Sequence, residues 1–280
     1  MTTSQPGLDD ARIADRGPDR DAPPVAALEM EDDAVGLDTA GWMALAIGLG
    51  LAVATQVFSF LEMLVGYFVV LVHEMGHALA GWLFGYPSLP AFDFTYGGGV
   101  TTHAGEQSML LVGIVLLCLV VVALAFRRNP LSLSLVAVVA GLYAALAFTR
   151  GHEAFIVAFG HGAELVFAFL FLQRAFTGNA CQLPAERPLY AWLGFHVVLH
   201  NLIFAWGLAT SALARQQYAD AKGGGHWMDF SRLAREHFGV SLEAIAVVFF
   251  VLCLLVPVLA FAWSWLGPQR DALRLRLGEV

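Results

Sequence analysis

Two histidines and a glutamate, His73, Glu74 and His77, form the pattern His-Glu-x-x-His inside a long apolar stretch of the chain. Residues four apart lie on the same face of an α-helix, so His73 and His77 can bind one metal ion together. Glu74 adjoins the first histidine and can act as a general base toward a water molecule at that ion. The three residues predict metal-assisted hydrolysis with a single zinc ion (Zn²⁺) as cofactor.

A catalytic zinc ion has three protein ligands and one open position, so a third ligand is expected from another segment. Glu164 is the first candidate, because a carboxylate at membrane depth is costly unless it is paired or bound to a metal. His161 lies one helical turn away on the same face and is the alternative ligand. Whichever of the two does not bind the ion can orient the other. Hydrogen bonding between helices, around a proton path, is the alternative to a metal site.

A second histidine pair, His196 and His200, has the same spacing in a later apolar segment and is followed by Asn201. These side chains are candidates for the third ligand, for a second ion, or for stabilising an oxyanion. Their alternative role is hydrogen bonding between helices.

The segment from 92 to 103 alternates aromatic and polar residues ahead of three glycines, Gly97, Gly98 and Gly99. This pattern predicts a short strand and a turn, and so a loop resembling a β-hairpin. Glycine backbone beside a metal site can pair with an extended substrate by strand addition, which makes these glycines candidate substrate-binding residues. A plain connecting hairpin is the alternative, and His103 is expected near the surface.

The composition identifies the elements that must position these residues. Of the 280 residues, 58% are hydrophobic and only 14% are charged, whereas soluble domains are about a quarter charged. A helix that spans the bilayer needs about 20 apolar residues. The sequence therefore predicts an all-α multi-pass membrane protein with about seven transmembrane helices, at 41–59, 63–85, 108–126, 131–149, 154–175, 189–212 and 241–266.

Charge is concentrated at the N-terminal end of the chain. Residues 1–40 contain ten of the 23 acidic residues and three of the 15 Lys and Arg residues. They lack a sustained apolar face, which predicts a disordered acidic tail. A transmembrane domain over 41–266 and a short tail over 267–280 complete the predicted organisation. The apolar segments exclude a soluble enzyme, and the absence of a basic face excludes a nucleic-acid-binding protein; the expected partner is the lipid bilayer.

The longest internal polar stretch covers residues 213–240. Large apolar residues recur in it at roughly helical spacing, namely Trp227, Met228, Phe230, Leu233 and Phe238. This pattern predicts a short amphipathic connector, in preference to a helix that lies in the membrane interface.

The run HEMGHALAGWLFGY, followed by a short loop and GGGVTTHAG, resembles the membrane-embedded zinc metallopeptidases of the site-2-protease type, in particular the compact bacterial branch that lacks a PDZ domain. The resemblance covers His73 to about Gly105. It implies an intramembrane endopeptidase of a bacterial inner membrane that cleaves transmembrane protein substrates, with His73 and His77 as zinc ligands and Glu74 as the base. The third ligand of that family is normally an aspartate in a later membrane segment. None of the later predicted segments contains an aspartate, so Glu164 or a histidine is expected in its place.

Two other classes of function are compatible with the residues. A catalytically silent membrane scaffold would keep a structural zinc ion, and replacing Glu74 with Gln would barely affect it. A metal or proton transporter would often contain paired repeats with interrupted segments, and the sequence shows no such internal similarity. Its translocation path would consist of His73, His77, Glu164, His196 and His200.

Overall fold

A computed structural model describes residues 39–95, 97–221 and 228–277, without the side chains of 268–277. The predicted acidic tail lies outside the described residues except for its last two, which begin the first helix. The predicted C-terminal tail is helical as far as Leu277, where the last helix ends.

Six helices of the described chain are long and apolar enough to cross a membrane, which indicates a multi-pass membrane protein. A further helix, α3 (Met109–Ala125), is apolar but has only 17 residues. The all-α multi-pass architecture is therefore confirmed, whereas a total of seven spans stays a prediction. The six are α1 (Thr39–Val57), α2 (Ser59–Leu83), α4 (Pro130–Ala147), α5 (Gly151–Thr177), α6 (Glu186–Thr210) and α9 (Leu242–Leu277), the last crossing over Leu242–Gly267.

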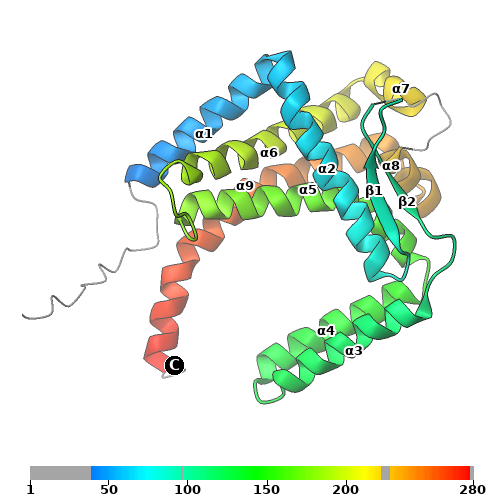
Figure 1. Cartoon of the computed structure of the whole chain (residues 1–280), viewed down its shortest axis with the longest axis vertical. Helices are drawn as coiled ribbons and strands as arrows, with labels where there is room; N and C mark the ends of the chain where they lie inside the picture. Colours follow the sequence, from blue (N-terminus) through cyan, green and yellow to red (C-terminus); the bar gives the residue numbers. More distant parts are fainter. Residues whose placement is uncertain (1–38, 96, 222–227, 278–280) are drawn as a thin grey trace, which may run out of the picture. The chain divides into compact units, whose positions relative to one another are not determined.

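Helix α5 is the central helix of the bundle, because it contacts α2, α6 and α9 (Figure 1). Helix α1 packs along α6 and is joined to α2 at Phe58, whose extended backbone separates the two helices. The core between α5, α6 and α9 consists largely of small and aliphatic side chains, among them Ala168, Leu172, Val197 and Ala260.

Two glycines explain how closely α2 approaches α5. A Cβ atom on Gly76 of α2 would overlap the carbonyl oxygen of Phe159 and the side chain of Ala163. A Cβ atom on Gly160 of α5 would overlap the imidazole rings of α2. Small residues of this kind allow helix backbones to touch in a membrane. They bring the His-Glu-x-x-His turn directly against α5.

The predicted hairpin is present after α2. Strands β1 (Ser88–Phe92) and β2 (Gly99–His103) pair antiparallel, with Ser88 opposite His103 and Phe92 opposite Gly99. Gly97 and Gly98 form the turn, with φ angles of 78° and 88°. At these positive φ angles the backbone of a residue with a Cβ atom is strained, whereas glycine adopts them freely. The hairpin lies alongside α2 (Figure 1). The indole of Trp82 donates to the carbonyl of Ser88 at 2.8 Å, and this bond holds the hairpin against α2.

The polar connector between α6 and α9 is helical in its described part. It contains α7 (Ala212–Asp220), α8 (Asp229–Arg232) and a π-helical turn, η2 (Leu233–Phe238), while Trp227 lies outside the described residues. Phe230 and Leu233 are buried among side chains of α5, α6 and α9, and Phe238 is exposed. The connector therefore packs onto the bundle and brings Asp229, the first residue of α8, toward α2.

Candidate metal site

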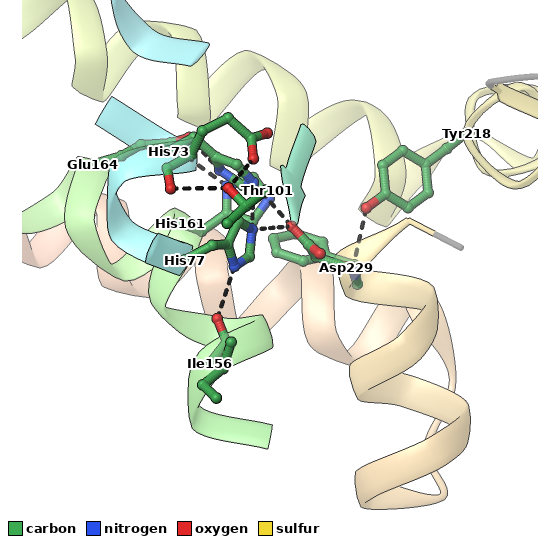
Figure 2. A network of polar contacts seen from close by, with 10 residues as sticks. His73, His77, Thr101, Ile156, His161, Glu164, Tyr218 and Asp229 are labelled. Atoms are coloured by element: carbon green, nitrogen blue, oxygen red, sulfur yellow. Dashed lines mark hydrogen bonds and ion pairs between the residues drawn. The ribbon is translucent and has the colours of Figure 1, made fainter. Parts of the chain in front are cut away.

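Three potential ligand atoms converge at the His-Glu-x-x-His turn (Figure 2). The Nε2 atoms of His73 and His77 lie 3.0 Å apart, as their spacing on α2 predicts. Asp229 Oδ2, from the start of α8, lies 2.9 Å from the first of these nitrogens and 3.0 Å from the second. The three atoms form a nearly equilateral triangle.

The other ring nitrogens determine what the triangle can bind. His73 Nδ1 lies 2.7 Å from Glu164 Oε1, and His77 Nδ1 lies 2.7 Å from the carbonyl oxygen of Ile156 (Figure 2). A carbonyl oxygen and an ionised carboxylate only accept hydrogen bonds, so each Nδ1 carries a proton and donates it. In the neutral imidazole, this assignment leaves a lone pair on both Nε2 atoms.

When both rings are neutral, two lone pairs and a carboxylate oxygen face one another at about 3 Å. Buried acceptors that face each other without a donor are destabilising. A cation between them would turn this repulsion into attraction. The group of His73, His77 and Asp229 can therefore hold a metal ion.

Glu164, the first sequence candidate for the third ligand, lies on the far side of His73. Its Oε1 atom contacts His73 Nδ1, and its Oε2 atom lies 3.2 Å from His161 Nδ1. His73, His161 and Glu164 are close enough to form a second possible ligand group, which shares His73 with the first. Asp229 is the residue whose carboxylate oxygen lies near the Nε2 atoms of both His73 and His77. Glu164 and His161, which the sequence offers as the third ligand, form a group with His73 but not with His77.

Glu74 lines the same cavity as the triangle and is held by the hairpin. Thr101 Oγ1 on β2 is 2.6 Å from Glu74 Oε2 and 3.0 Å from the Glu74 carbonyl oxygen. A Cβ atom on Gly99 would overlap the Glu74 carboxyl group. The absence of a side chain at position 99 thus leaves room for the carboxylate, a requirement that the sequence pattern does not reveal.

A cavity of about 670 Å³ joins these groups. His196 does not line it: the side chain is fully buried, and its Nδ1 lies 3.2 Å from Gln56 Nε2 of α1. The predicted site residues that do line the cavity are His73, Glu74, His77, Gly97, Gly98, Gly99, His161, Glu164, His200 and Asn201, together with the unpredicted Thr101, Tyr218 and Asp229.

Several titratable groups that line this cavity lie outside the membrane-spanning helices, and Tyr218 and His103 are two of them. Burial, reinforced by the carboxylate of Asp229, raises the pKa of Tyr218, so its hydroxyl stays protonated. This hydroxyl accepts a hydrogen bond from the backbone N–H of Phe230 at 3.1 Å and so fixes the start of α8 (Figure 2). Burial also lowers the pKa of His103, which keeps this imidazole neutral.

Comparison with known proteins does not identify the chain: no family model matches it, and neither a curated protein nor a solved structure shows significant similarity.

Proposed function

We propose that the chain is an intramembrane zinc-dependent endopeptidase of the site-2-protease type, located in a bacterial inner membrane. The observation that carries this proposal is the convergence of His73 Nε2, His77 Nε2 and Asp229 Oδ2 within 3.0 Å of one another, beside Glu74. Ligand atoms about 2.0–2.1 Å from a tetrahedral zinc ion lie about 3.3 Å apart, close to these separations. Two imidazole nitrogens and one carboxylate oxygen also suit zinc and leave one position open.

In this proposal Asp229, rather than Glu164, is the third ligand. The family resemblance implies an aspartate in this role, and Asp229 fills it from the connector. Glu164 accepts the Nδ1 proton of His73 and so keeps the lone pair of that ring directed at the ion. Such a partner fixes the tautomer and orientation of a metal-binding histidine.

Proton transfer is assigned to Glu74. A zinc ion bound at the triangle would polarise the scissile carbonyl group and lower the pKa of the attacking water. Glu74 accepts a proton from that water on a carboxylate oxygen and returns it to the leaving amine. The hydroxyl of Thr101 fixes the carboxylate by a hydrogen bond to Oε2.

Asn201 is assigned to the carbonyl oxygen of the substrate. Its side chain is 1% exposed and lines the cavity, yet its Nδ2 atom has no hydrogen-bond partner among the described residues. A buried donor without an acceptor destabilises the fold. A substrate oxygen that develops negative charge would provide the acceptor, and loss of such a donor lowers kcat by roughly 10²–10³.

The outer edge of β2 is assigned to the substrate backbone. The bonds from Asp93 N to Gly98 O and from Ala104 N to Pro87 O mark hydrogen-bonded pairs at both ends of the hairpin. Pairs alternate along an antiparallel ladder, so the backbone groups of Thr101 and His103 point away from β1. Both residues line the cavity. A substrate segment unwound from its helix could satisfy its exposed backbone at this edge.

The test is the variant Glu74→Gln in vesicles that contain transmembrane peptides, with Glu106→Gln, an exposed loop substitution, as the control. Wild type and both variants should retain one zinc ion per chain. Cleavage by Glu74→Gln should fall about 10²–10⁴-fold, because the general base is lost. Wild-type protein without zinc, or cleavage unchanged in Glu74→Gln, would refute the proposal. Zinc uptake into the vesicles without cleavage would instead favour a transporter.

A further inference from the structure

A second cavity, of about 640 Å³, lies between α5, α9 and the α8–η2 segment. Among the described residues that line it, only His161 is ionisable, and the mechanism proposed above gives this residue no role. We refer to it as the lateral recess. It is lined by Phe155, Ala158, Phe159, His161, Gly162, Leu165, Phe230, Leu233, Phe238, Val240, Ala244, Ile245, Val248, Phe249 and Leu252.

The lateral recess opens toward the surroundings of the bundle. Ala158 and Gly162 on α5 and Ala244 on α9 contribute little side-chain volume to its walls. At its rim, Val248 is 60% exposed and Phe238 is 59% exposed. Both α5 and α9 can cross a membrane, so the opening is continuous with the surface that the bilayer covers.

The length of the recess along α9 is close to the hydrocarbon thickness of one leaflet of a bilayer. Its lining on α9 runs from Ala244 to Leu252, near the start of the spanning segment. Eight residue steps along a helix cover about 12 Å. One leaflet accounts for half of a hydrocarbon core of about 30 Å.

We propose that the lateral recess binds one acyl chain of a membrane phospholipid. An unwound peptide strand is disfavoured, because the described lining offers almost no groups to satisfy exposed backbone N–H and C=O groups. A flexible hydrocarbon chain has no such requirement. A transmembrane helix is the competing occupant, and the test below includes its displacement of the bound chain.

The bound chain would support the metal site from behind. His161 lines both cavities, and its ring lies 4.5 Å from the ring of His73 and 4.5 Å from that of Phe230. Phe230 follows Asp229 directly in the chain, and its ring lies 5.2 Å from Phe249 on α9. An acyl chain against Phe230 and His161 would keep α8 packed on the bundle, and with it the Asp229 carboxylate near His73.

The direct test uses phosphatidylcholine vesicles whose acyl chains carry a photoreactive diazirine, followed by mapping of the labelled peptides. Label should concentrate on residues 155–165 and 244–252. The variant Val248→Trp should reduce this labelling at least fivefold by filling the rim. Val258→Trp is the matched control, because Val258 is 59% exposed on the same helix but does not line the recess; its labelling should equal that of the wild type.

Three outcomes would overturn the proposal: label spread evenly along α9, equal labelling in both tryptophan variants, or displacement of the label by a transmembrane substrate peptide. These arms require neither zinc nor cleavage, so they can succeed or fail independently of the proposed function. A second readout tests the coupling: zinc affinity of the delipidated wild type should rise severalfold on addition of phosphatidylcholine. In Val248→Trp, where the ring replaces the acyl chain, the affinity should be independent of lipid.

Discussion

Two pairs of histidines in this chain have the same spacing on apolar helices but end in different arrangements. The rings of His73 and His77 on α2 lie 4.6 Å apart between centroids, and their Nε2 atoms meet. The rings of His196 and His200 on α6 lie 6.0 Å apart. The i, i+4 spacing therefore places two rings on one face but does not by itself make them converge.

The difference comes from the partners of each pair. His196 Nδ1 lies 3.2 Å from Gln56 on α1, whereas His200 Nδ1 lies 3.5 Å from a carboxylate oxygen of Glu62 on α2. The α6 rings thus interact with two different helices. Among the described residues, none of the groups that could hold a metal ion includes either of them. Two features distinguish the α2 pair. The Asp229 carboxylate lies near both Nε2 atoms, and the Nδ1 atom of each ring has a hydrogen-bond acceptor, Glu164 for His73 and the Ile156 carbonyl for His77.

The largest effect should come from removing the shared carboxylate. Asp229→Ala leaves two neutral imidazoles as the only ligands, and we expect zinc content to fall from one ion per chain to nearly none. Asp220→Ala, an exposed aspartate of the same connector, should leave zinc content unchanged. Metal analysis of both purified variants tests this. Full zinc content in Asp229→Ala would move the third-ligand role back to Glu164 or His161.

The next largest loss of zinc binding should come from filling the space beside the His73 and His77 rings. A Cβ atom at position 160 would overlap His77 Nε2 and approach His73 Cε1 at 2.8 Å, so Gly160→Ala should displace both rings. We expect zinc affinity to fall about 100-fold, the loss that misplacement by about 1 Å can cause in a preorganised site. Gly141→Ala is the control, because a Cβ atom there meets no atom within 4 Å. Competition with a zinc-binding dye would measure both affinities, and equal values would contradict the role given to Gly160.

The sequence predicts the α2 pair, the hairpin and the apolar helices because each depends on a local pattern. It does not locate Asp229, the third ligand in our proposal, because Asp229 and His73 are 156 residues apart in the chain and only the folded connector brings them together. One sequence signal could have indicated a buried aspartate: of the aspartates after His77, only Asp93 and Asp229 have large apolar residues on both sides. This signal leaves two candidates for a third ligand, and Asp93 lies on the hairpin.

Glu164 shows a second limit of sequence analysis. Depth along α5 correctly places its carboxylate next to the histidines of α2. Depth along a helix cannot separate a metal ligand from a hydrogen-bond partner, however, because both nitrogens belong to the same imidazole ring of His73. The orientation of the His73 ring determines which nitrogen faces which carboxylate. That orientation is set by Asp229 at Nε2 and by Glu164 at Nδ1.

A smaller effect on zinc affinity should come from the carboxylates near the Nδ1 atoms. Each histidine pair has one: Glu164 beside His73 and Glu62 beside His200. Glu164→Gln keeps the shape but weakens the acceptor for His73 Nδ1–H, so zinc affinity should fall about 10-fold, the lower end for an outer-sphere partner. Glu62→Gln makes the same change behind His200 and should leave zinc affinity unaltered. Isothermal titration of zinc into both apo variants compares them. Equal losses would show that the α6 pair also contributes to the site.

The smallest effect should come from removing an α6 ring altogether. His196 is fully buried, and its Nε2 atom has no hydrogen-bond partner among the described residues. In His196→Leu the cost of that unpaired atom disappears, while the contact with Gln56 is lost; Gln56 is partly exposed and can turn to solvent. The two terms oppose each other, so the free energy of unfolding should change by no more than about 1 kcal/mol. Thermal denaturation in detergent, with and without zinc, measures this. A loss well above that value only in the presence of zinc would mean that His196 binds an ion, and the contrast between the two pairs would no longer hold.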